Sequence, residues 1–297
     1  MSQAVTIDTV RFEEAPVRQP NRLSAFTRRL LRDPVGAVAG AILILIVLGC
    51  LTAPLWTPGD PLVGKISERL QPVGTSGHIL GTDEQGRDML GRLAYGGRNS
   101  LLAGILPVLF GGMIGAVLGI IAGHFGGIVN TIIMRTMDIF YAFPAVLLAI
   151  GIAAALGAGL MNLVISISVV LIPPVARVAE SAVRQIETRP FIEAARASGA
   201  NSFQIILRQV VGNVFAPIFV YMSTLIGLSI VYASGLSYLG LGISQPTPEW
   251  GAMLNSLKDS IYTNPGLVAV PGMMIFIVSM CFNLVSDTIR EAMDSKL

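Results

Sequence analysis

Few side chains in this sequence could carry out covalent or metal chemistry. Residues 59–65 have the spacing of a phosphate-binding loop, but Ile66 stands where a serine or threonine should bind magnesium. Pro61 also removes one of the backbone N–H donors that would hold the phosphate. The chain has only two histidines, His78 and His124, which leaves little material for a histidine-based metal centre or a catalytic triad. We therefore expect no catalytic residue, no metal and no cofactor in this chain.

Two weaker candidates are not favoured. His78, Asp83 and Asp88 could surround a hard cation in one loop, but a solvated loop is strongly favoured over a metal site. Ser237 in an apolar setting suggests an intramembrane serine protease, but no histidine lies in a later apolar segment to act as its base.

The composition excludes an ordinary soluble protein. Of the 297 residues, 53% are hydrophobic and only 13% are charged, whereas soluble domains contain about 25% charged residues. Such a composition indicates extensive contact with membrane lipid. The net charge of +2 argues against a nucleic-acid partner.

Six apolar segments approach the roughly 20 residues that cross a bilayer as a helix. They cover residues 35–56, 101–122, 139–156, 163–176, 214–233 and 268–285. The fourth is short and contains Pro173 and Pro174, which a membrane helix tolerates when neighbours satisfy the freed backbone groups. The sequence therefore predicts an all-α polytopic membrane protein with six transmembrane helices.

The distribution of lysine and arginine predicts the orientation. With the N-terminus inside, 14 of the 20 basic residues fall on the cytoplasmic side, as the positive-inside rule requires. Both termini are then cytoplasmic. The expected division is a cytoplasmic segment 1–34, a first helix 35–56, an outer loop 57–97, a five-helix core 98–290 that contains an internal loop 177–212, and a cytoplasmic tail 291–297.

The spans carry no ionisable residue near their centres. The nearby charges are Arg135, Asp138, Arg177, Glu180 and Asp287, and all of them lie at predicted cytoplasmic ends. Proton- and sodium-coupled carriers usually have ionisable groups near the midplane. Any transport by this chain must therefore take its energy from elsewhere.

Glycine recurs at every fourth position in and after the second span, at Gly111, Gly115, Gly119, Gly123 and Gly127. On a helix this spacing forms a groove that lets a second backbone approach closely. Each glycine costs a soluble helix about 1 kcal/mol relative to alanine, so the row implies that something packs against it. Packing within the same bundle is the favoured interpretation, and contact with a second membrane subunit is the alternative.

The internal loop 177–212 has the signals of two short helices. Pro190 suits a first helical position, and good helix formers follow it. Gly199 supplies a left-handed stop, and Asn201 or the next residue can cap a second helix over 203–211. We expect a helix, a sharp turn and another helix that project from the membrane and present a thin face to a partner. An amphipathic loop that rests on its own bundle is the alternative.

Within this loop, Glu193, Ala194 and Ala195, followed after three residues by Gly199, resemble the EAA loop of permease subunits in binding-protein-dependent ABC importers. Three further segments are similar to signatures of the dipeptide/oligopeptide/nickel branch of that family. They are residues 80–83 with 86–88, residues 95–101 and residues 246–251. The chain departs from the family pattern at Gly212, where proline is usual, and at Gly91, where serine is common.

The resemblance implies a type I ABC importer permease fold in a bacterial inner membrane, with a periplasmic loop 57–97 and a cytoplasmic coupling helix. The residues that it implies for coupling to the ATPase are Glu193, Ala194, Ala195, Arg196, Ala197, Ser198 and Gly199. The implied partners are a second homologous permease subunit, two ATP-binding subunits or domains that bind ATP and magnesium, and a periplasmic solute-binding protein.

Branch membership favours di- or oligopeptides as the solute, with nickel chelates and glutathione-like compounds as alternatives. A stand-alone secondary transporter and an intramembrane enzyme are rivals from other classes. A homodimeric permease would keep the architecture but change the partner.

Overall fold

The computed structural model describes residues 33–57 and 59–294, and within them the regular elements are all helical. The helices are α2 (Pro34–Leu51), α3 (Ala53–Trp56), α4 (Met89–Phe125), α5 (Gly127–Tyr141), α6 (Ala145–Leu156), α7 (Leu160–Glu187), α8 (Pro190–Ala197), α9 (Ser202–Ile205), α10 (Val211–Tyr238), α11 (Trp250–Leu257) and α12 (Pro265–Asp294). Shorter 3₁₀ turns cover Ile66–Glu68 and Lys258–Tyr262, and a π-helical turn covers Ile206–Val210. The expected all-α class is confirmed. Most of the predicted segment 1–34 and residues 295–297 of the tail lie outside the described residues.

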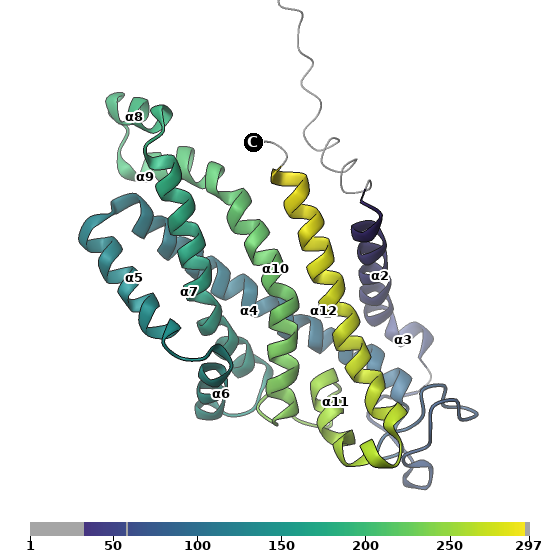
Figure 1. Cartoon of the computed structure of the whole chain (residues 1–297). Coiled ribbons are helices and arrows are strands. Elements are labelled where there is room, and N and C mark those ends of the chain that lie inside the picture. The colour runs from purple at the N-terminus through teal and green to yellow at the C-terminus, as the bar shows by residue number, and fades with distance from the viewer. Residues whose placement is uncertain (1–32, 58, 295–297) are drawn as a thin grey trace, which may run out of the picture.

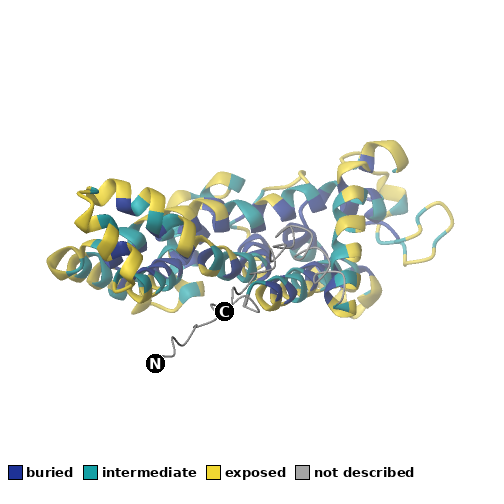
Figure 2. Ribbon diagram, turned by 90° about the horizontal axis from the view of Figure 1, so that it is seen from above, coloured by how far each residue is buried: buried dark blue, intermediate teal, exposed yellow. Residues whose placement is uncertain are grey.

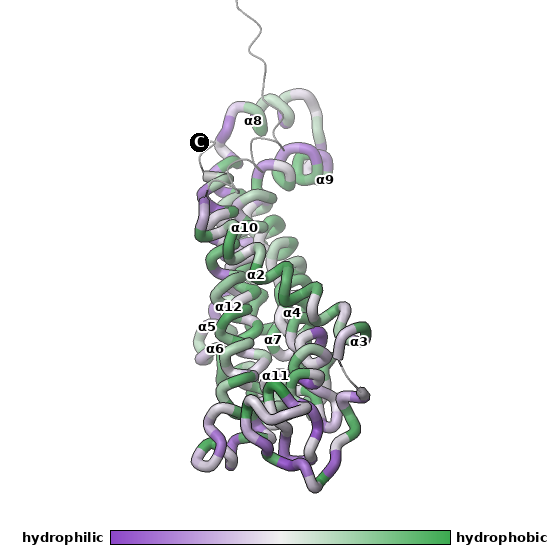
Figure 3. Tube along the Cα trace, turned by 90° about the vertical axis from the view of Figure 1, so that its right-hand side faces the viewer, coloured by the Kyte–Doolittle hydropathy of each residue, from purple (hydrophilic) through white to green (hydrophobic). Residues whose placement is uncertain are grey.

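A hydrophobic middle band separates two more polar ends (Figure 3). Five described helical segments are long and apolar enough to cross a membrane, with mean hydropathy between 1.8 and 2.6 over their best windows, and the pair α5–α6 adds a sixth if it counts as one span. Large apolar side chains face outward, such as Leu45 at 72% and Ile128 at 79% exposure. Water disfavours so much exposed apolar surface, whereas lipid accommodates it. The chain is therefore a multi-pass membrane protein.

The chain crosses the band back and forth, so that its described elements fall at two opposite ends (Figure 1). The start of α2, the helices α8 and α9 and the end of α12 lie at one end, which we call the inner end. The loop 59–88 and α11 lie at the opposite, outer end. Seen from above, the molecule has a long outline, and buried residues lie between neighbouring helices (Figure 2).

The third span differs from the straight helix expected over residues 139–156. It consists of α5 and α6, which meet at an angle of 88°. The break covers Ala142, Phe143 and Pro144, because proline lacks an N–H and disfavours helical geometry in the residue before it. Placing this span in one uninterrupted helix was wrong.

The outer loop also ends earlier than expected, at Asp88 instead of residue 97. The Asp88 carboxylate accepts a hydrogen bond from the Gly91 N–H at 2.7 Å and so caps α4. The charged residues that follow are compatible with a helix, because Arg92 and Arg98 donate to main-chain carbonyls of neighbouring segments. Asp88 capping and these two contacts explain why residues 89–97 are helical.

The internal loop is likewise shorter than 177–212. Residues 177–187 continue α7, and residues 211–212 begin α10. The connection between the two spans is therefore residues 188–210, which we call the inner elbow.

Helices α4 and α7 form the most extensive helix pair among the described elements. A Cβ atom on Gly111, Gly115 or Gly119 would lie 2.3–2.6 Å from a backbone carbonyl oxygen of α7, and one on Gly123 would lie 2.7 Å from a side-chain carbon of the same helix. These four glycines thus face α7 of their own chain. Gly127 does not belong to the row: it starts α5 with φ of +48° and has no heavy atom within 4 Å of an added Cβ.

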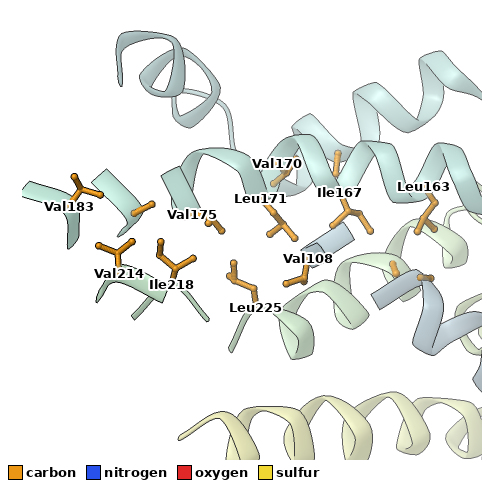
Figure 4. Packing of buried hydrophobic residues seen from close by; sticks show 14 of the residues in the cluster. Val108, Leu163, Ile167, Val170, Leu171, Val175, Val183, Val214, Ile218 and Leu225 are labelled. Carbon is orange, nitrogen blue, oxygen red and sulfur yellow. The ribbon is translucent and has the colours of Figure 1, made fainter. Parts of the chain in front are cut away.

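The main hydrophobic core lies between α4, α7 and α10 (Figure 4). Side chains of the three helices point toward one another there, namely Val108 of α4, Leu163, Ile167, Val170, Leu171, Val175 and Val183 of α7, and Val214, Ile218 and Leu225 of α10. The same cluster reaches the inner elbow through Ile192, Ile205 and Val210. The core therefore connects the elbow directly with the spans.

Candidate functional site

The short helix α8 begins and ends at the residues that the sequence indicates. Pro190 occupies its first turn, and the Ile192 side chain is fully buried in the core. At the C-terminus the Gly199 N–H donates to the Arg196 carbonyl, and the Ala200 N–H donates to the Ala195 carbonyl. This pair of hydrogen bonds requires the residue just after the end of the helix, here Gly199, to adopt the left-handed backbone conformation. Gly199 has φ of +80°, so the expected left-handed stop is confirmed.

The second expected helix, over residues 203–211, is not a separate element. Asn201 and Gln204 form the reciprocal bonds of a capping box at the start of α9. After one turn of α9, the π-helical residues 206–210 lead directly into α10. Ile205 and Val210 are buried, and this burial holds the segment in line with the span. The elbow is therefore one free helix followed by the extended start of α10.

Most of the residues expected to couple to an ATPase lie on the surface of α8. Exposed are Glu193, Ala194, Arg196, Ala197, Ser198 and Gly199, and Ala195 is half-buried against the core. The alanines and the glycine leave a low surface on which a partner's main chain could pack closely. Arg196 is exposed but also donates to the Glu187 carboxylate of α7.

The outer end brings two of the sequence signatures together. The Glu249 carboxylate is fully buried and caps α11 by accepting hydrogen bonds from the N–H groups of Gly251 and Ala252. It also accepts a hydrogen bond from the Ser100 hydroxyl of α4 at 3.0 Å. Burial raises the pKa of Glu249, and the bonds that it accepts oppose this rise. The Trp250 indole donates to a carbonyl of α4 at 2.9 Å. Residues 95–101 and 246–251 therefore form one contact, which sequence spacing does not reveal.

The third outer signature holds the loop 59–88 against α4. The buried Asp83 carboxylate lies 2.6 Å from Arg87 and 3.2 Å from Arg92. His78 instead lies 2.9 Å from Asp88 and 3.4 Å from Glu68. The hydrogen bond with Asp88 is the main cause that raises the pKa of His78. Because Asp83 pairs with arginines and Asp88 with His78, the three possible cation ligands do not converge.

The break in the third span opens a cavity that the sequence reasoning missed. This cavity, of about 220 Å³, lies between α5, α6, α7 and α10. Its wall includes Phe140, Tyr141, Phe143, Tyr221 and Tyr232, together with the proline pair of α7. Pro144 in the middle of an apolar run is the signal that could have found the break.

Comparisons with known proteins agree along almost the whole chain. Residues 115–297 match the family described as binding-protein-dependent transport system inner membrane component, and residues 22–72 match the N-terminal transmembrane domain of oligopeptide transport permease C. The glutathione transport system permease protein of Pectobacterium atrosepticum is 39% identical over 281 residues, which cover 95% of this chain and 93% of that protein. The corresponding protein of Salmonella typhimurium is 37% identical over 286 residues, which cover 95% and 94%.

A solved structure shares the fold. The MetNI methionine ABC transporter in an inward-facing conformation superposes with a TM-score of 0.56 and 19% identity, covering 69% of this chain and 97% of the matched chain. At this identity the likeness concerns architecture only.

Proposed function

Because this chain belongs to the family of binding-protein-dependent transport inner-membrane components, we propose that it forms one half of an ATP-driven import pathway for a small peptide, with glutathione as the first solute to test. The observation that carries the proposal is the 39% identity to a glutathione permease over 95% of the chain. Glutathione is a tripeptide, so it falls within the peptide class that the sequence favours.

The broken third span supports the assignment of the pathway. Non-helical backbone at membrane depth is tolerated only against protein or a water-filled cavity. The first N–H groups of α6 have no intrahelical acceptor, and no side chain caps them. We assign the break and the adjoining cavity to the wall of the pathway, which the second permease subunit completes.

Two features support an inner-membrane orientation with the inner end in the cytoplasm. Most of the basic residues fall on that side of the predicted spans. The start of α2 and the end of α12 lie at this inner end together with α8 (Figure 1). The loop 59–88 then faces the periplasm, where a solute-binding protein can reach it.

The energy comes from partner subunits in this proposal. The chain itself is non-catalytic, and two ATP-binding subunits bind and hydrolyse ATP with magnesium. Residues Glu193 to Gly199 of the elbow contact these subunits, and the exposed, low surface of α8 is what supports this role. Closure of the ATPases would move α8 and so change the access of the pathway.

Uptake into proteoliposomes tests the proposal. The chain is purified with the subunits that accompany it, and uptake of labelled glutathione is measured with the solute-binding protein and ATP. We expect uptake that requires ATP and that unlabelled dipeptides reduce only weakly. Concentrative uptake by the chain alone, driven by an ion gradient, would overturn the coupling to ATPases. ATP-driven uptake of dipeptides but not of glutathione would overturn the choice of solute.

A further inference from the structure

One carboxylate at the inner end joins three helices. Glu187, the last residue of α7, lies with Oε1 2.6 Å from Nδ1 of His124 at the end of α4. Its other oxygen, Oε2, accepts a bond from Arg196 of α8. We call His124, Glu187 and Arg196 the inner triad. Each oxygen of Glu187 thus serves a different helix.

Burial makes the hydrogen bond between Glu187 and His124 of α4 stronger than the bond between Glu187 and Arg196 of α8. The side chains of His124 and Glu187 are only 4% and 14% exposed, whereas Arg196 is 49% exposed. The hydrogen bond between His124 and Glu187 is thus shielded from water, whereas the bond to Arg196 lies at the surface. Bonds to a charged group are stronger than neutral ones, and solvent weakens the outer bond to Arg196.

The glycine row of α4 ends beside this triad. Gly123 precedes His124 directly, and a Cβ atom at Gly123 would lie 2.7 Å from Val183 of α7. Along about three turns the two helices approach so closely that one cannot shift without displacing the other. We therefore treat α4 and α7 as one rigid pair, with Glu187 at its inner end.

From this geometry we infer that Glu187 is the positioning residue that makes α8 move with the α4–α7 pair, so that motion of the elbow reaches the cavity through α7. Helix α7 contributes Val170, Leu171, Pro173 and Pro174 to the cavity wall. The other route, into α10, passes through the π-helical residues 206–210, and no ion pair joins α8 to α10 in the described part of the chain. The functional part of this inference rests on the proposed function.

A matched pair of isosteric variants tests the inference. Glu187→Gln removes the charge of the triad and leaves its shape. Glu180→Gln makes the same change about two turns earlier on α7. There Glu180 pairs with Arg184 and Asn130, and it has no hydrogen bond or ion pair with α8 in the described part of the chain. Arg196→Gln breaks only the outer bond at an exposed position and serves if Glu187→Gln fails to assemble.

The first measurement is amide hydrogen exchange in the purified complex. We expect residues 190–199 to exchange about tenfold faster in Glu187→Gln and in Arg196→Gln, and at the wild-type rate in Glu180→Gln. This measurement needs no solute. It therefore decides whether the triad holds α8 even if the proposed solute or energy source is wrong.

The second measurement is solute transported per ATP hydrolysed. We expect Glu187→Gln to keep ATP hydrolysis and the KM for the solute but to lower this ratio about tenfold, an effect that general loss of folding would not produce. A wild-type ratio in Glu187→Gln, or an equal loss in Glu180→Gln, would overturn the inference.

Discussion

Replacing Gly119 by alanine tests the close contact between α4 and α7. The added Cβ would lie 2.3 Å from the carbonyl oxygen of Ala176 and 2.6 Å from Cβ of Ala179. Carbon atoms need roughly 3.5 Å from such neighbours, so the two helices must separate by about 1 Å. Neither contacting atom belongs to a flexible side chain that could move away.

The expected size of the effect follows from two opposing terms. Overpacking a dense helix contact costs about 1–3 kcal/mol, and alanine returns about 1 kcal/mol of helix propensity. We expect Gly119→Ala to lower the free energy of unfolding by up to about 2 kcal/mol, with a correspondingly lower thermal midpoint. The assay is thermal unfolding of the purified complex in detergent.

Gly151 in α6 provides the matched control. It is also a glycine inside a membrane helix, but an added Cβ there has no heavy atom within 4 Å. Gly151→Ala should therefore leave the midpoint unchanged or raise it, since only the propensity term remains. Equal midpoints for the two variants would refute the reasoning that the glycine row holds α4 against α7.

Three further predictions concern the elbow and the outer end. Gly199→Val should abolish transport while the protein still reaches the membrane, because a β-branched residue is strained at φ of +80°; Gly199→Asn, which tolerates that conformation, should retain transport in the same uptake assay. The contacts of His78 with Glu68 and Asp88 should stabilise the outer loop fully below the ordinary histidine pKa of 6.5, and this stabilisation should be lost as the pH rises through the raised pKa of His78. Proteolysis of the loop should therefore become faster at high pH in the wild type. In His78→Gln the rate of proteolysis should lose this dependence on pH. Glu249→Ala should lower the free energy of unfolding by about 3 kcal/mol, because the buried N–H groups of Gly251 and Ala252 lose their acceptor. Glu249→Gln keeps one acceptor oxygen and should lower the free energy of unfolding clearly less. The thermal midpoints of the two variants measure this difference.

The sequence predicted much of the candidate site because local chemistry fixes it. The free helix α8 follows from Pro190 at its start and Gly199 at its end, and both lie where their backbone preferences place them. The separate second helix was wrong, since burial of Ile205 and Val210 joins that segment to α10. Local signals cannot show which apolar residues the rest of the fold will cover.

What the sequence by itself determined is the all-α membrane class and the family, because hydropathy and short motifs are properties of the chain read in order. The tertiary structure alone decided which partners the small and charged residues meet. Four glycines of the row face α7, whereas a Cβ added to Gly127 would have no heavy atom of the described chain within 4 Å. Glu249 contacts Ser100 across 149 positions of sequence. Glu187 joins His124 to Arg196. These contacts depend on how separate helices pack, and no spacing within one segment contains that information.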